Sequence, residues 1–165
     1  MQQPPSVEPR SKLGVRKTIT VAATQTHAFQ VFTRDISKWW PLRTHHIGAA
    51  DANATVIEPR ASGRCYEIGV DGSECDWGRV RVWEPPDRLI IAWEINADWK
   101  HDVNVVSEVE IRFMVVGAKQ VRVELEHRGL ESFGARALEM RGAFDSPGGW
   151  TGLLAAYCAA VEEGS

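Results

Sequence analysis

The segment 150-WTGLLAAYCAAVEE-163 decides the fold, because its large side chains repeat with the period of an α-helix. Apolar residues follow one another at helical spacings, at Trp150, Leu153, Leu154, Tyr157, Cys158 and Val161. This spacing places them on one stripe of a helix, which we expect to begin near Ser146–Pro147 and to end at Gly164. The stripe needs an apolar surface on which it can be buried, and the preceding residues must supply that surface.

A series of predicted strands precedes the helix. Prolines and the pair Asp71–Gly72 interrupt the apolar runs and mark the turns between them. The strands are expected at residues 15–22, 55–58, 64–70, 77–84, 88–96, 106–116 and 120–128. From the second strand onward no helical pattern separates them, which favours an antiparallel meander.

Short helices are expected on either side of the meander. Thr24 is a suitable N-cap for one that follows the first strand. A second is expected at residues 35–40, because Pro41 prevents its continuation. Another is expected at residues 132–143, just before the long helix.

Alternation along the strands indicates which face of the sheet is buried. Apolar side chains occupy every second position within 89–95, 109–115 and 121–125, and His127 continues the last series. In the last two of these strands, the positions between are mainly Glu and Arg. One dry face predicts an α+β fold, in which a curved antiparallel sheet of six to seven strands wraps around the long C-terminal helix. A cavity is expected where helix and sheet diverge.

Composition limits the classes of function. The 165 residues suffice for a single domain, expected at residues 14–163 after a disordered leader at residues 1–13. The net charge of −3 disfavours nucleic-acid binding, and no apolar stretch approaches the roughly 20 residues of a membrane span. Cys65, Cys75 and Cys158 have no metal-ligand spacing. We therefore expect a cytoplasmic protein with reduced thiols, no metal and no cofactor.

Motifs in series along the chain resemble those of a known superfamily. They are Trp39–Trp40–Pro41, Ser62–Gly63–Arg64, Trp77–Gly78–Arg79–Val80, Glu84–Pro85–Pro86–Asp87–Arg88–Leu89, Trp93, Leu125–Glu126–His127–Arg128–Gly129 and Gly149–Trp150. In this order, over residues 14–163, the chain resembles the SRPBCC superfamily, also called START-like or birch-pollen-allergen-like. Within it, the chain is similar to the group named for homology to the activator of the heat-shock-protein-90 ATPase. The resemblance implies the helix-grip fold, with two short helices after the first strand, and implies little about chemistry.

His127 is a candidate polar group of the cavity. It follows the apolar series of its strand in phase, so its imidazole is expected on the dry side near the cavity rim. There it would orient a ligand or act as a general base. The alternative interpretation is a histidine whose nitrogens are satisfied by neighbouring groups.

Arg64 and Tyr66 are the other polar candidates. They share a phase with apolar residues of their strand, which predicts that both point inward. Arginine is well suited to bind a ligand carboxylate or phosphate. The alternatives are an ion pair of Arg64 with Glu58 or Glu67, and a core position for Tyr66 with its hydroxyl at the surface.

Seven tryptophans are many for this length and make an apolar pocket credible. Four of them are candidate walls for a flat ligand, although a tryptophan taken alone is more often a core residue than a ligand contact. Trp77 and Trp83 are expected on the outer face instead, from their phase. The predicted ligand-binding set is Trp40, Arg64, Tyr66, Trp93, Trp99, His127, Trp150, Leu154 and Tyr157.

No phosphate-binding loop, dinucleotide fingerprint or nucleophile elbow occurs, which disfavours a conventional hydrolase, kinase or dehydrogenase. Three functions remain open. The first is binding of a hydrophobic, aromatic small molecule with an anionic or hydrogen-bonding end. The second is a cyclase- or dehydratase-like enzyme with His127 as acid or base. The third is a stress-related, co-chaperone-like interaction module or homodimer that uses a patch around Trp77 and Trp83. His45–His46 is expected to be a solvated loop or a pocket lid, since no further metal ligands accompany it.

Overall fold

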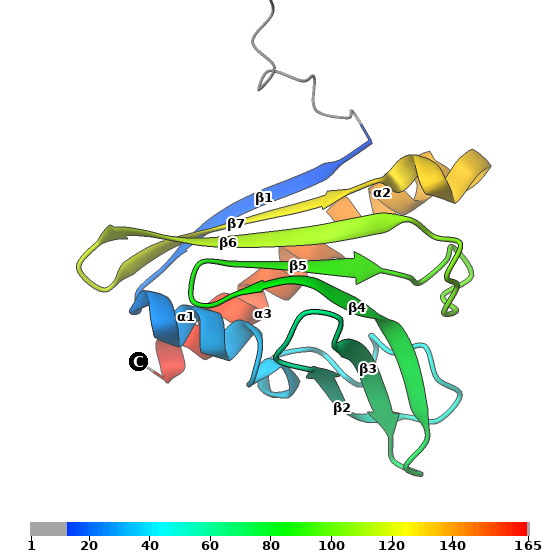
Figure 1. Ribbon diagram of the computed structural model, residues 1–165, viewed down its shortest axis with the longest axis horizontal. Helices are drawn as coiled ribbons and strands as arrows, with labels where there is room; N and C mark the ends of the chain where they lie inside the picture. Colours follow the sequence, from blue (N-terminus) through cyan, green and yellow to red (C-terminus); the bar gives the residue numbers. More distant parts are fainter. Residues whose placement is uncertain (1–12, 165) are drawn as a thin grey trace, which may run out of the picture.

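The computed structural model describes residues 13–164 as a curled sheet with helices packed against it (Figure 1). Apart from Leu13, the leader expected at residues 1–13 lies outside the described residues. The strands are β1 (Val15–Val21), β2 (Ala52–Ile57), β3 (Arg64–Gly69), β4 (Glu74–Glu84), β5 (Arg88–Trp93), β6 (Ser107–Gly117) and β7 (Gln120–Arg128). The helices are α1 (Gln25–Phe32), the 3₁₀ turn η1 (Ile36–Lys38), the 3₁₀ segment η2 (Leu130–Arg136), α2 (Ala137–Asp145) and α3 (Trp150–Glu163).

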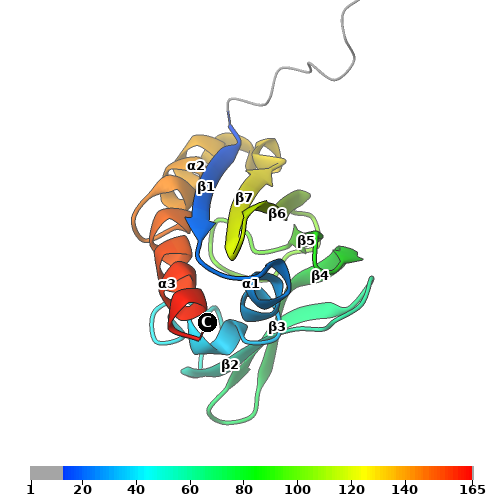
Figure 2. The ribbon, with the colours of Figure 1, turned by 90° about the vertical axis from the view of Figure 1, so that its left-hand side faces the viewer.

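The seven strands form one antiparallel sheet in the order β1-β7-β6-β5-β4-β3-β2. From β2 to β7 every strand pairs with its neighbour in the chain, and β1 joins the free edge of β7. Figure 2 shows the sheet curling from β1 to β2, with α2 and α3 on the side toward which it curls. This arrangement confirms the predicted α+β helix-grip fold.

The core lies between the concave face of the sheet and α3. Ile111, Val123 and Leu125 occupy alternate positions of β6 and β7 and are at most 2% exposed. From α3, Leu154 and Val161 are buried to the same degree. Burial of each such side chain stabilises the fold by about 1.5–3 kcal/mol. The predicted dry face of β6 and β7 is therefore the face that packs against the helix.

Two bulges in β4 change the direction of its side chains. Trp77 is an extra residue opposite the Cys65–Tyr66 step of β3, and Arg81 is an extra residue opposite the Ile90–Ile91 step of β5. Each bulge shifts the alternation of the strand by one position. As a result Trp77 is buried in the core and Trp83 packs against it. The prediction that these two tryptophans lie on the outer face is wrong.

The helix predicted at residues 132–143 forms in two parts. Gly134, with a φ of 60°, interrupts η2, and α2 follows it and continues to Asp145. A sharp turn at residues 146–149 then separates α2 from α3. A Cβ atom on Gly149 would lie 2.3 Å from the carbonyl oxygen of Ala143, so the turn requires a glycine there.

The first helix is joined to the last through a buried tyrosine. The Thr24 hydroxyl accepts a hydrogen bond from the His27 amide at 3.2 Å, which caps α1 as predicted. The Tyr157 hydroxyl, fully buried, donates to the carbonyl oxygen of Ala28 at 2.7 Å. The Tyr157 ring also meets the Phe32 ring edge-on, with 5.2 Å between their centroids. These contacts hold α1 against α3 at one end of the curl.

Replacement of Tyr157 by phenylalanine tests this connection. Y157F leaves the buried Ala28 carbonyl without its donor, so we expect the free energy of unfolding to fall by about 1–2 kcal/mol in urea titrations. Tyr66, the other tyrosine, has no hydrogen bond from its hydroxyl among the described residues, so Y66F is the matched control. Equal effects of the two variants would contradict the role assigned to Tyr157.

Candidate functional site

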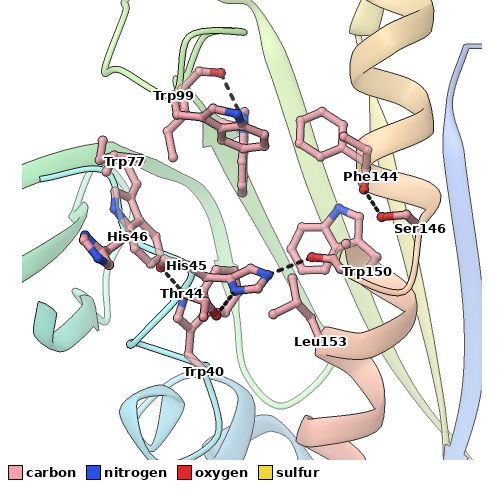
Figure 3. Close-up of a pocket in the computed structure, with 16 residues that line it drawn as sticks. Trp40, Thr44, His45, His46, Trp77, Trp99, Phe144, Ser146, Trp150 and Leu153 are labelled. Atoms are coloured by element: carbon pink, nitrogen blue, oxygen red, sulfur yellow. Dashed lines mark hydrogen bonds between the residues drawn. The ribbon is translucent and has the colours of Figure 1, made fainter. Parts of the chain in front are cut away.

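A pocket of about 440 Å³ opens where the beginning of α3 diverges from the sheet (Figure 3). Its wall is built from the loop after η1, from β4 and β5, from the loop between β5 and β6, and from the turn between α2 and α3. The lining residues are Trp40, Thr44, His45, His46, Ile47, Trp77, Trp93, Ile95, Trp99, Ala143, Phe144, Ser146, Gly148, Gly149, Trp150 and Leu153.

Five of the lining residues are tryptophans, and four of them contact one another, whereas Trp99 contacts the Phe144 ring. The Trp40 and Trp77 ring centroids lie 5.1 Å apart, and those of Trp93 and Trp150 lie 6.1 Å apart. Four of the indole N–H groups donate to protein acceptors: Trp40 to the His45 carbonyl (2.9 Å), Trp77 to Glu67 (2.8 Å), Trp93 to the Ile95 carbonyl (3.2 Å) and Trp150 to His127 (3.1 Å). Because these polar atoms are satisfied, the rings offer mainly carbon surface to the cavity.

Trp99 borders the pocket and is the most exposed of these rings, with 46% of the residue accessible. Its φ is 60°, in the left-handed region that bulky residues rarely adopt. Asn96 holds the turn: its side-chain oxygen accepts from the amides of Asp98 and Lys100 at 3.0 Å each, and its carbonyl accepts from Trp99 at 2.9 Å. The turn thus fixes an exposed indole at the pocket, at a conformational cost of about 1–3 kcal/mol.

The polar side chains of the pocket are few and uncharged or weakly basic. His45 Nε2 donates to the carbonyl oxygen of Gly148 at 2.7 Å, and its Nδ1 lies 2.7 Å from the Thr44 hydroxyl oxygen. His46 Nδ1 lies 3.1 Å from the carbonyl oxygen of Gly48. None of the lining residues is a lysine, arginine, aspartate or glutamate. His45 therefore links two parts of the wall, and the cavity carries no fixed charge on its surface.

The structure places four of the predicted ligand-binding residues in this wall: Trp40, Trp93, Trp99 and Trp150. Leu154 and Tyr157 lie farther along α3, inside the core, and Leu153 lines the pocket instead. Sequence reasoning did not find Trp77, Ile95 or Phe144 as wall residues. Aromatic and apolar character was the only available signal for them, and it does not separate a wall from a core.

Arg64 and Tyr66 lie outside the pocket, on the other face of β3. The buried members of this strand are Cys65 and Glu67, at 3% and 1% exposure. The Arg64 guanidinium pairs with Asp76 at 2.7 Å and lies 4.0 Å above the Tyr66 ring. The predicted inward direction of Arg64 and Tyr66 is wrong, because apolar residues occupy both phases of this strand and alternation alone does not select one.

His127 lies directly behind the pocket wall and is fully buried. Its Nδ1 accepts from the Trp150 indole, its Nε2 lies 3.4 Å from the Ser107 hydroxyl, and its ring centroid is 4.3 Å from that of Phe144. Burial lowers the pKa of His127 to about 3, so the imidazole is neutral at physiological pH. Both nitrogens face groups of the protein, as the alternative interpretation of this residue expects.

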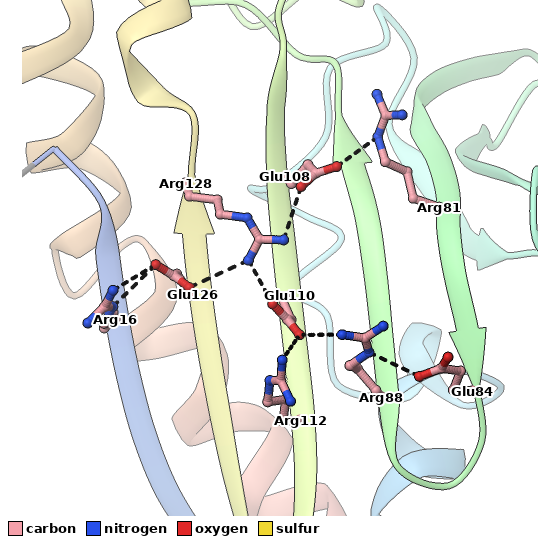
Figure 4. A network of polar contacts seen from close by, with 9 residues as sticks. All are labelled: Arg16, Arg81, Glu84, Arg88, Glu108, Glu110, Arg112, Glu126 and Arg128. Carbon is pink, nitrogen blue, oxygen red and sulfur yellow. Dashed lines mark hydrogen bonds and ion pairs between the residues drawn. The ribbon is translucent and has the colours of Figure 1, made fainter. Parts of the chain in front are cut away.

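The convex face of the sheet carries a network of arginines and glutamates (Figure 4). Glu110 lies at its centre, 7% exposed, and contacts Arg128 at 2.7 Å, Arg112 at 2.8 Å and Arg88 at 3.3 Å. Burial opposes ionisation of Glu110, but the hydrogen bond from Arg128 and the three positive charges outweigh it and hold the pKa of Glu110 below its ordinary value. The network extends to Arg16, Arg81, Glu84, Glu108 and Glu126.

Within residues 13–164, no group of three histidine, cysteine, aspartate or glutamate side chains is arranged to hold a metal ion. The helices described for these residues are too short or too polar to cross a membrane. A cytoplasmic location and independence of a cofactor stay predictions.

A family model and several solved structures match the chain. A family model described as Activator of Hsp90 ATPase homolog 1-like protein matches residues 22–155. Among solved structures, the anthrahydroquino-gamma-pyrone synthase Txn09 shares 37% identity, with 88% of this chain and 95% of the synthase covered and a TM-score of 0.63. CalC, a self-sacrificing resistance protein from Micromonospora echinospora, shares 30% identity over 92% of this chain and 96% of its own, with a TM-score of 0.70.

A third structure, the Aha1 dimer from Colwellia psychrerythraea, shares 15% identity over 92% of this chain and 98% of its own, with a TM-score of 0.60. At this identity the likeness concerns the fold alone. No curated protein sequence matches the chain.

The buried neutral state of His127 predicts a pH dependence of stability. In the unfolded chain a histidine binds a proton below about pH 6.5, whereas folded His127 does so only near pH 3. The contribution of buried His127 to the free energy of unfolding is therefore complete above pH 6.5 and declines as the pH falls toward 3. Between about pH 7.5 and about pH 5, we expect the wild type to lose about 2 kcal/mol more than H127Q in urea titrations. Parallel losses would contradict a buried, neutral His127.

Glu110 predicts a second pH effect, at lower pH. The pKa of Glu110 is depressed in the folded state, so its ionised form contributes to the free energy of unfolding at pH values above its unfolded-state pKa of about 4.3. This contribution is lost as the pH falls through the pKa of the folded state. We expect E110Q to be less stable than wild type by about 1 kcal/mol at neutral pH, after screening of its partly exposed partners. The difference between the two proteins should shrink as the pH falls below about 4.3. A difference that does not change with pH would show that charge is not its cause.

Proposed function

Since the chain belongs to the Activator of Hsp90 ATPase homolog 1-like family of the SRPBCC superfamily, we propose that it binds a flat, aromatic and uncharged small molecule in the tryptophan-lined pocket. The observation that carries this proposal is the convergence of five indole rings on one cavity of about 440 Å³. Ligand pockets commonly have volumes of about 300–1,000 Å³, with apolar and aromatic walls and few polar groups.

The indole rings favour a flat ligand because they offer stacking and edge contacts without losing hydrogen bonds of their own. An aromatic pair contributes about 0.5–1.5 kcal/mol beyond the area that it buries. Trp99 would bury the most additional apolar surface on ligand binding, because it is the most exposed of the wall tryptophans. Contact with a ligand would remove that apolar area from water, at about 25 cal/mol for each Å².

The composition of the wall favours an uncharged ligand. A carboxylate in this pocket would lose hydration and find no lysine or arginine among the lining residues. The buried carboxylate of Glu67 lies behind Trp77, and it would repel an anion. An anionic ligand end bound by Arg64 is therefore not part of the proposal. Hydroxyl and carbonyl groups on the ligand could instead reach His45 or the backbone of the turn between α2 and α3.

The two relatives with 37% and 30% identity support a ligand of this kind. One is named as a synthase of an anthrahydroquino-gamma-pyrone, which is a fused aromatic ring system, and the other as a self-sacrificing resistance protein. Each is covered over nearly its whole length.

A ring-closing enzyme is the second candidate, favoured by the similarity to the synthase. His127 is a poor acid or base for it, because its nitrogens face Trp150 and Ser107 behind the wall. His45 and His46 are the titratable side chains that line the pocket, so a catalytic version would use one of them. An interaction module loses the outer patch on which it depended, since both of its tryptophans point inward. A homodimer stays a prediction.

Titration with a matched pair of ligands tests the proposal. We expect 1,8-dihydroxyanthraquinone to quench the tryptophan fluorescence saturably with a Kd of about 1–10 μM, and its 3-carboxylate to bind about tenfold more weakly. Free N-acetyltryptophanamide corrects for absorption of light by the ligand.

Two tryptophan variants localise the binding. W99A removes an exposed wall ring and should weaken binding about tenfold, whereas W83F alters a core tryptophan outside the pocket and should change the Kd by less than about twofold. Absence of saturable binding, or equal effects of the two variants, would reject the proposal. Tighter binding of the carboxylate would reject its uncharged character.

A further inference from the structure

Glu67 is a buried carboxylate that has no cationic partner at close range. It lies on β3 and is 1% exposed. Its Oε1 accepts from the Ile47 amide at 2.7 Å and from the Trp77 indole at 2.8 Å, and its Oε2 accepts from the Gly48 amide at 3.0 Å. Within residues 13–164, its one ion-pair contact is His46 Nδ1 at 4.0 Å. Neutral N–H donors, and not a cation, therefore replace most of the water that would solvate this carboxylate.

The three donors belong to two separate parts of the pocket wall. Ile47 and Gly48 are in the loop after η1, and Ile47 lines the cavity. Trp77 is the bulged residue of β4, and its ring lines the cavity next to that loop. Hydrogen bonds to an ionised acceptor are stronger than those between neutral groups, so one carboxylate holds both parts in a defined relation.

The packing around the carboxylate leaves the loop little freedom to approach differently. A Cβ atom on Gly48 would lie 2.9 Å from the Glu67 Oε2 atom and 3.1 Å from the Cys75 sulfur. A larger residue at this position would shift the carboxylate, whose hydrogen bonds hold it in place. The loop thus rests directly on Glu67, and its position depends on that group.

We propose that Glu67 is a positioning residue for ligand binding: it fixes the Ile47–Gly48 backbone and the Trp77 ring in the arrangement that forms the pocket. A buried charge without a cation is costly, and a purely structural strand position would be served as well by an apolar side chain. The link to binding rests on the proposed function, whereas the link to the wall can be measured without any ligand.

The variant E67Q tests the proposal with E110Q as matched control. Glutamine has one acceptor oxygen and an NH₂ group that faces a donor, so at least one of the three N–H groups loses its partner. E110Q makes the same change at the other buried glutamate, on the convex face and far from the pocket lining.

Two measurements are made on each protein. Hydrogen exchange of the Ile47 and Gly48 amides, followed by NMR without ligand, should be about tenfold faster in E67Q and unchanged in E110Q. The Trp77 indole N–H signal should move upfield in E67Q alone. The Kd for 1,8-dihydroxyanthraquinone should rise about fivefold or more in E67Q and stay within about twofold in E110Q.

Unchanged exchange in E67Q, or faster exchange with an unchanged Kd, would overturn the proposal. If E67Q does not fold, G48A replaces it, because the added Cβ must displace the carboxylate; the same local exchange and weakened binding are then expected, and a wild-type response overturns the proposal. If the wild type binds no anthraquinone, the proposed function fails, and the ligand-free exchange data alone decide whether Glu67 holds the wall.

Discussion

Burial of α3 against the concave face of the sheet is the constraint on which the rest of the structure depends. Leu154, Tyr157 and Val161 occupy the inside of the curl along most of the helix and are almost inaccessible to water. At the beginning of the helix, Trp150 still contacts the sheet through His127 and Trp93, and the pocket lies beside it. Helix and sheet are thus packed together along most of α3, and aromatic rings surround the space that is left near its first turn.

The fold could be predicted from the sequence because the period of α3 and the alternation of β6 and β7 each define one apolar face. The site could be predicted only in part. Trp93 and Trp150 stand out as large aromatic residues at the ends of elements, but the direction of Trp77 depends on a bulge. A bulge is a property of the pairing between two strands, so the alternation within one strand does not reveal it.

Glu67 shows the same limit for polar residues. A glutamate in a strand is normally expected to face water, since burial of its charge is favourable only when several donors surround it. Here two of the donors come from a loop about 20 residues earlier in the chain, which has no periodicity of its own. The opposite error arose at Arg64, whose acidic partner Asp76 lies on the neighbouring strand. In both cases the environment is assembled by tertiary structure and not by the local pattern.

The left-handed backbone at Trp99 sets thermal stability and the shape of the pocket wall against each other at a single position. Glycine or asparagine would adopt this conformation more readily, so a substitution that relaxes the turn also removes the indole ring. Because the turn is held by Asn96 and not by the indole itself, the scaffold should tolerate such exchanges. The shape of the pocket could therefore change here without disturbing the sheet or the helix.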